Sequence, residues 1–429
     1  MAARALTSFL VIGAGAAGLI AARELARAGK TVTIVEARDR CGGRIYPLPA
    51  EEFGYPAEGG PEFVHGAAPV TRAIIREAGL SLLPRGGTRW STRTGSLLPD
   101  EPAVAHWDRF YQALEAVTVD LSIAEFLETH FAGAQYDALR RSVTRTVEGY
   151  DAADPRRIST VALRDEWMAR DDGEHGRIAE GHGALIAYLE SEYRRYGGKI
   201  LLGAPVAAVD ETPAGIAARC RDGTVFEADA AILTLPPPLL SDVALPHAAR
   251  ERAAAAAADI GYGNVVKILL RFGSKWWVDR GGQDLKDLSF LISDATVPTW
   301  WTQYPAAYPV LTGWYAGPKA DRVSSLTETE LVEMGLASLA EIFDLSLDDI
   351  TKDLIASRAI NWGNDPFARG AYSYATTKTR EAQSAMRDPE GGRIFFAGEA
   401  LYAGPDMGTV EAALASGLET AQRILAAGS

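Results

Sequence analysis

The stretch 11-VIGAGAAGLIAARELARAGKTVTIVEARDRCGGR-44 decides the fold. An apolar strand precedes a glycine-rich turn, a helix follows the turn, and a second apolar strand ends at Glu36. Gly13, Gly15 and Gly18 have the spacing G-x-G-x-x-G. This order favours a βαβ unit whose turn and helix N-terminus hold a dinucleotide pyrophosphate, while Glu36 accepts hydrogen bonds from ribose hydroxyls. The alternative is that the glycines only form a tight turn between strand and helix and bind no dinucleotide.

The residues after Glu36 predict a second phosphate-facing loop. A glycine pair, Gly42 and Gly43, lies between Arg38 and Arg44. Backbone amides of such a pair and the fixed positive charge of arginine suit a phosphate. A nicotinamide enzyme does not need this second loop.

Composition excludes several classes of function. The chain has 429 residues and a formal net charge of −13, which argues against nucleic acid and against anionic membrane surfaces as partners. We find no apolar run long enough for a membrane span. The six histidines show no metal-ligand spacing. Cys41 and Cys220 form no disulfide framework, so we expect a reducing, cytoplasmic compartment.

Nucleotide-type strands occur at the start, middle and end of the chain, which predicts a discontinuous α/β domain interrupted twice by another domain. Residues 66 to 181 are expected to be mainly helical, and a last helix is expected from about Met407 to Ala427. The predicted segments of the nucleotide-binding domain are 1–65, 182–260 and 361–429. The inserted domain takes 66–181 and 261–360.

A lysine interrupts the apolar stretch 261-GYGNVVKILLRF-272, which we predict to be one strand bounded by glycines. On a period of two, Lys267 shares a face with Val265, Leu269 and Arg271, so it could point into solvent. If it is buried instead, its ammonium needs a partner.

Four stretches together resemble the flavin-containing amine oxidases, a family of monoamine oxidases, polyamine oxidases and flavin histone-lysine demethylases. They are residues 11–44, NWGNDPFARGAYSY (361–374), RIFFAGE (393–399) and GTVEAALASGLETAQRIL (408–425). The matches span essentially the whole chain. The resemblance implies an α/β fold: a discontinuous Rossmann-like FAD-binding domain with an inserted α+β substrate-binding domain of mixed sheet and helices.

The resemblance also implies which residues contact FAD. The helix N-terminus at Gly408 would face the pyrimidine edge of the flavin, and Glu399 would lie near the ribityl chain and phosphates, unless it is a helix cap or surface ion pair. Trp362 would pack near the flavin or belong to the core. Ala371 stands where monoamine oxidases carry the cysteine that binds flavin covalently, so non-covalent FAD is expected. The complete predicted set is Gly13, Gly15, Gly18, Glu36, Arg38, Gly42, Gly43, Arg44, Val206, Trp362, Gly398, Glu399, Gly408, Thr409 and Val410.

Four catalytic positions follow from the same resemblance. Lys267 would hold a water at the reactive nitrogen of the flavin, and Tyr372 would form one wall of an aromatic cage for the amine. Thr409 takes the place of the second ring, which leaves the cage half built. His65 would face the substrate, with Glu62 near the mouth, although a lone histidine is often structural.

We therefore expect an FAD-dependent amine oxidase. The amine would lose hydride from its α-carbon to the flavin, the imine would hydrolyse, and molecular oxygen would be reduced to hydrogen peroxide. Diamines, polyamines or secondary amines are the favoured substrates, and a homodimer is possible. An L-amino-acid oxidase of the same fold is the alternative and needs an arginine for the substrate carboxylate, for which Arg89 or Arg93 could serve. A flavin-bound protein without turnover is the alternative of another class.

Overall fold

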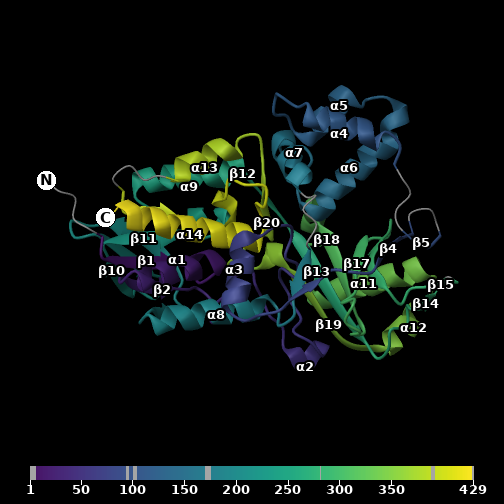
Figure 1. Ribbon diagram of the computed structural model, residues 1–429, viewed down its shortest axis with the longest axis horizontal. Helices are drawn as coiled ribbons and strands as arrows, with labels where there is room; N and C mark the ends of the chain where they lie inside the picture. The colour runs from purple at the N-terminus through teal and green to yellow at the C-terminus, as the bar shows by residue number, and fades with distance from the viewer. Residues whose placement is uncertain are drawn as a thin grey trace.

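The computed structural model describes residues 6–92, 96–99, 104–169, 175–280, 282–387 and 392–427. Figure 1 shows two parts side by side. On the left, helices cover a sheet on both faces. On the right, a second sheet lies below a lobe of helices. Among the described residues, no helix combines the length and apolar character needed to cross a lipid bilayer.

The sheet of the first part is parallel and draws its strands from the beginning, middle and end of the chain. Its order is β21-β11-β1-β2-β7. The strands are β1 (Ser8–Ile12), β2 (Thr31–Val35), β7 (Lys199–Leu201), β11 (Ala230–Leu233) and β21 (Ile394–Phe396). A parallel sheet is covered on both faces, which explains the nearly continuous apolar sequence of β1 and β11. The predicted discontinuous α/β fold is confirmed, whereas the residue boundaries of the five segments stay a prediction.

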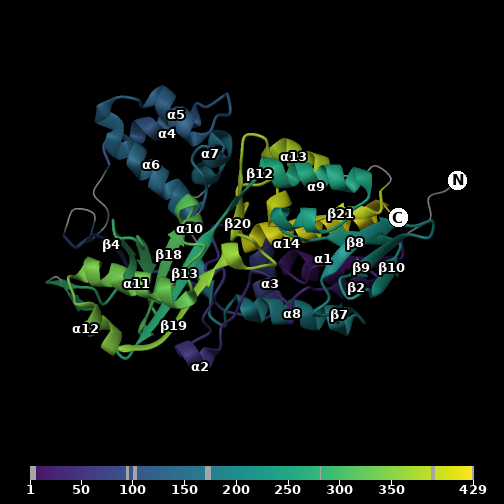
Figure 2. The ribbon, with the colours of Figure 1, turned by 180° about the vertical axis from the view of Figure 1, so that it is seen from behind.

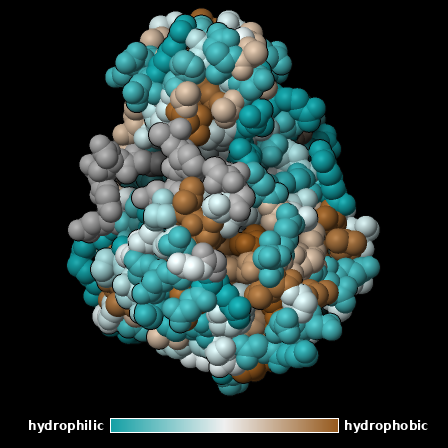
Figure 3. Space-filling model, turned by 90° about the vertical axis from the view of Figure 1, so that its right-hand side faces the viewer, coloured by the Kyte–Doolittle hydropathy of each residue, from teal (hydrophilic) through white to brown (hydrophobic). Residues whose placement is uncertain are grey.

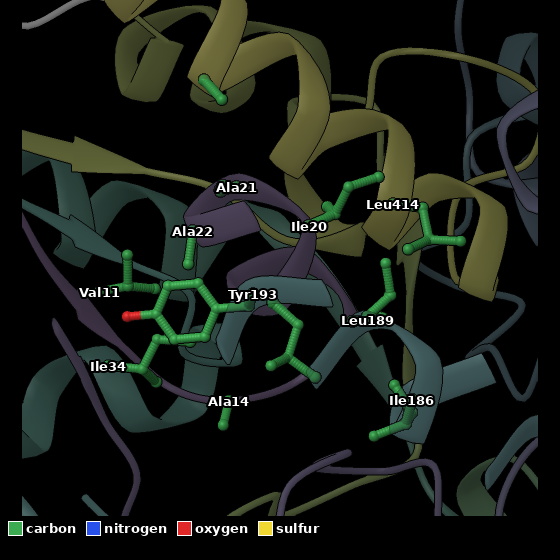
Figure 4. Packing of buried hydrophobic residues seen from close by; sticks show 14 of the residues in the cluster. Val11, Ala14, Ile20, Ala21, Ala22, Ile34, Ile186, Leu189, Tyr193 and Leu414 are labelled. Atoms are coloured by element: carbon green, nitrogen blue, oxygen red, sulfur yellow. The ribbon is translucent and has the colours of Figure 1, made fainter. Parts of the chain in front are cut away.

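Helices from distant parts of the sequence pack together on one face of this sheet. They are α1 (Ala16–Arg27), α3 (Pro69–Glu77), α8 (His182–Arg195) and α14 (Val410–Ala427). Figure 4 shows Ile20 of α1, Leu189 of α8 and Leu414 of α14 in their shared core. A Cβ atom on Gly417 would lie 2.3 Å from the carbonyl oxygen of Ala17, so glycine is needed for this close approach of α14 to α1.

The opposite face carries a small antiparallel sheet and two helices. These elements are β8 (Val206–Glu211), β9 (Ile216–Cys220), β10 (Val225–Ala228), α9 (His247–Asp259) and α13 (Thr379–Arg387). Figure 2, seen from behind, shows β8, β9 and β10 side by side at the outer end of this part.

The second part is built on a seven-stranded sheet in the order β19-β13-β18-β17-β16-β4-β5, in which only the β16–β4 pair is parallel. Its strands are β4 (Thr88–Ser91), β5 (Leu98–Pro99), β13 (Val265–Phe272), β16 (Leu288–Ile292), β17 (Thr299–Trp301), β18 (Val310–Ala316) and β19 (Leu354–Asn361). Val266, Ile268 and Leu270 of β13 pack on α11 (Glu328–Phe343). Lys267 therefore lies on the opposite face of the sheet.

The helical lobe comprises α4 (Trp107–Glu115), α5 (Ile123–His130), α6 (Asp137–Tyr150) and α7 (Thr160–Ala169). Ser122 and Glu125 form a capping box at the start of α5. The mainly helical prediction for residues 66–181 is only partly right, because β4 and β5 in this region join the seven-stranded sheet, and β3 (Leu82–Pro84) pairs with β6 (Gly176–Ile178). These strands have only two to four residues, too few for a periodic pattern to appear in the sequence.

The prediction of one strand over residues 261–272 is wrong. β12 (Ile260–Gly263) pairs with β20 (Tyr372–Ala375), and β13 begins at Val265 in the seven-stranded sheet. Between them, the side chain of Asn264 accepts a hydrogen bond from the amide of Val265 at 2.7 Å. Such a local side-chain bond competes with the ladder and breaks the strand. Likewise, the last helix begins at Val410, three residues later than predicted.

The remaining described elements are short: α2 (Ala50–Phe53), α10 (Pro318–Asp321), α12 (Leu347–Lys352), β14 (Asp279–Arg280), β15 (Gln283–Asp284), and the 3₁₀ turns η1 (Ala134–Tyr136), η3 (Pro237–Asp242), η4 (Trp362–Asn364) and η5 (Glu399–Leu401).

Candidate functional site

The glycine-rich turn between β1 and α1 combines a structural glycine pair with an open cradle. A Cβ atom on Gly18 would lie 2.0 Å from the carbonyl oxygen of Gly13, whose φ is +108°. These two glycines therefore close the turn. A Cβ atom on Gly15 would meet nothing within 4 Å, and Gly15 lines a large cavity. Because no side chain caps the N-terminus of α1, its backbone amides are available to an anion.

Glu36 joins this turn to the second loop. Its carboxylate is 6% exposed and accepts hydrogen bonds from the amides of Ala14, at 2.6 Å, and Arg38, at 2.8 Å. A carboxylate can accept about four hydrogen bonds, so capacity for a ribose hydroxyl remains. The guanidinium of Arg38 forms a bidentate ion pair with Asp365, at 2.5 and 2.8 Å.

Arg44 ties the second loop to the C-terminal segments. Gly42 and Gly43 precede it with positive φ, and the amide of Gly42 donates to the carbonyl of Ala14 at 2.8 Å. The guanidinium of Arg44 donates to the carbonyl of Ala371 at 2.8 Å and to Glu399 at 2.7 Å. Contacts over more than 300 residues of sequence thus assemble one wall.

The segment 398–410 forms the next part of that wall. Glu399 is 5% exposed and also accepts a short hydrogen bond from the hydroxyl of Ser373, so it is a buried partner of Arg44 and not a surface ion pair. Gly408 has a φ of +84° and lies against Tyr372. The hydroxyl of Thr409 accepts from the amide of Ala412 at 3.2 Å and so caps α14.

A single cavity of about 1650 Å³ collects nearly all of the predicted residues. Gly18 does not line it, since its part in the turn is internal. The predicted residues on its wall are Gly13, Gly15, Glu36, Arg38, Gly42, Gly43, Arg44, His65, Val206, Lys267, Trp362, Tyr372, Gly398, Glu399, Gly408, Thr409 and Val410. The volume exceeds the several hundred cubic ångströms of an ordinary ligand pocket, as a dinucleotide together with a substrate requires.

Lys267 is buried in this wall, so the alternative that its side chain points into solvent is wrong. It is 1% exposed, and its ammonium donates to the carbonyl of Gly60 and to Glu62, both at 3.0 Å. The nitrogen also lies 5.6 Å from the ring centre of Trp301. On the same face of the sheet, Leu269 packs against Leu48, Phe53 and Tyr55, so this face is covered beside Lys267.

The suggested position of Glu62 at the cavity mouth is also wrong. This carboxylate is buried beside Lys267, and it accepts hydrogen bonds from Arg177, Trp301 and Gln303 as well. Burial by itself would raise the pKa of Glu62, but Lys267 and Arg177 outweigh burial and lower the pKa to about 2. A second amine of the substrate therefore finds no free carboxylate here.

The predicted substrate residues lie on the same cavity. Tyr372 donates its hydroxyl hydrogen to the carbonyl of Tyr150 at 2.6 Å. His65 is within hydrogen-bond distance of His175, with 3.2 Å between their Nδ1 atoms, and Nδ1 also lies 3.3 Å from the hydroxyl of Tyr150. Trp362 is both a core residue, 4% exposed with its indole donating to Gly59, and a wall residue.

Sequence reasoning missed an aromatic wall. Trp314 stacks on Tyr372 with a centroid distance of 6.5 Å, and Trp301 follows at 5.7 Å from Trp314. Phe63 and Phe290 continue the wall. Figure 3 shows the outer surface of the second part, with the helical lobe at the top of the view and hydrophobic residues on the surface below it. Trp314 on β18 is the register partner of Lys267 on the neighbouring strand β13, so the two side chains lie on one face of the sheet. The sequence indicated apolar strands here, but it did not give this register.

The comparisons with known proteins place the chain in a family. The sequence profile of the flavin-containing amine oxidoreductases matches residues 16–425. The chain belongs to this family.

Relatives with 26% identity cover almost the whole chain. Human lysine-specific histone demethylase 2 aligns over 453 residues, 98% of this chain and 53% of that protein. Polyamine oxidase 2 of Arabidopsis thaliana aligns over 97% of this chain and 87% of its own length. The chain thus spans about half the length of this demethylase.

Solved structures show the same fold. Cyclohexylamine oxidase from Brevibacterium oxydans IH-35A matches with a TM-score of 0.80 at 21% identity, over 98% of this chain and 99% of that chain. Wild-type putrescine oxidase bound to putrescine matches with a TM-score of 0.80 at 20% identity, over the same shares of the two chains.

Proposed function

We propose that the chain is an FAD-dependent amine oxidase with non-covalently bound FAD. The observation that carries the proposal is one continuous cavity, whose wall includes Gly15 of the open cradle, the buried Lys267, and the stacked rings of Tyr372 and Trp314. Bound FAD would supply the two-electron oxidation of the amine to an imine and deliver the electrons to oxygen, which gives hydrogen peroxide.

The residues of the chain would divide the remaining work. Gly13, Gly15 and the N-terminus of α1 would hold the pyrophosphate, and Glu36 would accept from the ribose. Arg44 and Glu399 would fix the wall beside the flavin. Trp362 and the α14 N-terminus at Gly408 to Val410 would contact its ring system, and Val206 would lie near the nucleotide. The aromatic wall would orient the amine and exclude water, while Lys267 would supply positive charge. Ala371 offers no sulfur for a covalent bond.

Acidic groups on the cavity wall support diamines, polyamines or secondary amines as substrates. Asp151, Glu166 and Asp406 line the cavity on the side of Tyr372, where a second ammonium would be attracted. Burial raises the pKa of Asp406, and the negative charges of Glu411 and Glu166 raise it further. Thr409 contributes no ring, so it leaves room for a bulky or N-alkylated amine.

The amino-acid oxidase alternative has one supporting observation. Arg89 lies on β4 and lines the cavity, where it could meet a substrate carboxylate. Arg93 lies outside the described residues. Oxygen as electron acceptor, a cytoplasmic location and a homodimer remain predictions.

A panel of amines tests the proposed substrate class. Hydrogen peroxide release should give a higher kcat/KM for diamines, polyamines or N-methylated amines than for benzylamine. Thr409→Tyr should shift this preference towards small primary amines, and His65→Ala should impair extended substrates most. Thr409→Ser is the matched control, because it keeps the hydroxyl that caps α14 and should keep the preference.

Three results would each redirect the proposal. A wild-type preference for benzylamine over every extended amine would overturn the substrate class and leave the amine oxidase standing. Peroxide from L-amino acids alone would select the alternative enzyme. No peroxide from any substrate would favour a flavin-bound protein without turnover.

A further inference from the structure

Glu62, to which the proposed function gives no role, is the centre of a buried cluster. Its two carboxylate oxygens accept hydrogen bonds from four side chains. Lys267 donates at 3.0 Å, Gln303 at 2.7 Å, Arg177 at 3.1 Å, and the indole of Trp301 at 3.0 Å to one oxygen and 3.1 Å to the other. The donors come from β6, β13, β17 and the residues after β17, so the carboxylate joins three strands to its own loop.

The cluster holds one negative charge between two positive charges. Side-chain exposure is 1% for Lys267, 7% for Glu62 and 13% for Arg177. Arg177 is fixed from its other side, because it donates to the carbonyls of Thr302 and Tyr304 and lies 4.4 Å from the ring centre of Phe63. Without Glu62, neither the buried Lys267 nor the partly buried Arg177 would be in contact with a carboxylate of the described residues.

We propose that Glu62 is the positioning residue of Lys267. Glu62 and the carbonyl of Gly60 each accept one hydrogen from the ammonium, which has three. These two contacts fix the direction of the third N–H on the cavity wall. The catalytic effect of this positioning rests on the proposed function. The energetic coupling between Glu62 and Lys267 does not, because it can be measured from the stability of the fold.

Other titratable groups face this pair from the neighbouring elements. Glu58 precedes Glu62 on the same segment, and burial raises its pKa to about 7. Burial first, and then the charge of Lys267, lower the pKa of His182 at the start of α8 to about 4. Burial raises the pKa of Tyr55, and the charge of Glu62 raises it further. At neutral pH, His182 and Tyr55 are thus uncharged, and Glu62 is the counter-ion in contact with Lys267.

Thermal unfolding of the flavin-loaded protein tests the coupling without any assay of activity. Glu62→Gln should lower the melting temperature strongly, since it leaves Lys267 and Arg177 unpaired. Adding Lys267→Met to Glu62→Gln should raise the melting temperature again, because one of the two unpaired cations is removed. In the wild-type background, Lys267→Met should lower it. Lys267→Met would thus raise the melting temperature in the Glu62→Gln background and lower it in the wild type. Such opposite effects require Glu62 and Lys267 to interact.

Glu58→Gln provides a matched control. Glu58 is 3% exposed, and its Oε1 accepts from the amide of Gly183, with no ion pair to a cation in the described part of the chain. Burial raises the pKa of Glu58 and the charge of Lys267 offsets part of that rise, but no hydrogen bond joins the two side chains in the described part of the chain. In this background, Lys267→Met should therefore still lower the melting temperature and not raise it. Additive losses in the Glu62→Gln background would overturn the proposal.

Kinetics test the positioning role. Glu62→Gln should lower the rate at which oxygen reoxidises the reduced flavin at least tenfold. It should change the KM for the amine less than threefold. In the Lys267→Met background, the same substitution should change that rate less than twofold. If Glu62→Gln does not fold, Glu62→Asp replaces it and should retain more activity than Lys267→Met. If Glu62→Gln lowers the rate equally in the wild-type and Lys267→Met backgrounds, Glu62 does not act through Lys267. If the wild type oxidises no amine, the proposed function is overturned, and the thermal unfolding experiment alone decides whether Glu62 and Lys267 are coupled.

Discussion

Replacing Lys267 with methionine should lower turnover with oxygen at least tenfold, while folding and flavin content survive. Methionine has a similar length and no charge, so the apolar contacts of β13 remain and the positive charge on the cavity wall is lost. A tenfold loss corresponds to about 1.4 kcal/mol of activation free energy, the scale of one preorganised electrostatic contact. Stopped-flow absorbance, with the amine step and the oxygen step measured separately, provides the test.

Arg271→Met is the matched control on the same strand. Arg271 is four residues further along β13, is partly exposed and donates to the backbone carbonyls of Glu51 and Glu52, outside the cavity. The loss of this charge should change turnover less than twofold. If Lys267→Met oxidises its best amine at the wild-type rate, the buried ammonium has only a structural role.

Replacing Gly15 with valine should abolish flavin binding and leave the fold intact. The backbone at Gly15 has φ of −74° and ψ of 179°, which valine adopts without strain, and a Cβ atom there meets no protein atom within 4 Å. The new side chain would instead occupy the space that the pyrophosphate needs. We expect flavin content at least tenfold lower and an unchanged melting temperature of the flavin-free protein.

Gly18→Ala should behave differently from Gly15→Val. Its Cβ atom would lie 2.0 Å from a backbone oxygen, so both the melting temperature and the flavin content should fall. Flavin content is measured in the supernatant after acid precipitation, and all the wild-type flavin should be released there. Colour retained in the pellet would contradict non-covalent binding. Full flavin content in Gly15→Val would contradict the claim that the pyrophosphate binds at Gly15.

Much of the architecture is legible from local sequence. The βαβ unit was predictable because apolar strands, a glycine turn and a periodic helix follow one another without interruption from Ser8 to Val35. The discontinuous sheet followed from apolar strands at both ends and in the middle of the chain. The break at Asn264 was not predictable, because it depends on which partners the two halves find: β12 pairs with β20, more than 100 residues away, whereas β13 joins the seven-stranded sheet.

The site was predictable where a motif carries its own chemistry. The glycine turn, Glu36 and the C-terminal segment are of this kind. By contrast, Glu62 lies in a loop without periodicity, so its side-chain direction depends on Lys267 and Arg177, which are 205 and 115 residues away. The sequence placed Trp301 and Trp314 in apolar strands. Only the register between β17, β18 and β13 shows that they lie on the same face of the sheet as Lys267.

The central claim is that this cavity oxidises an amine with bound flavin, and anaerobic mixing tests it most directly. The purified protein is mixed with a diamine, a polyamine or an N-methylated amine in the absence of oxygen, and the visible absorption of the flavin is followed. The account predicts that the absorption is lost with at least one of these amines and returns, together with hydrogen peroxide, when air is admitted. Flavin absorption that no amine changes in fully loaded wild-type protein would contradict it.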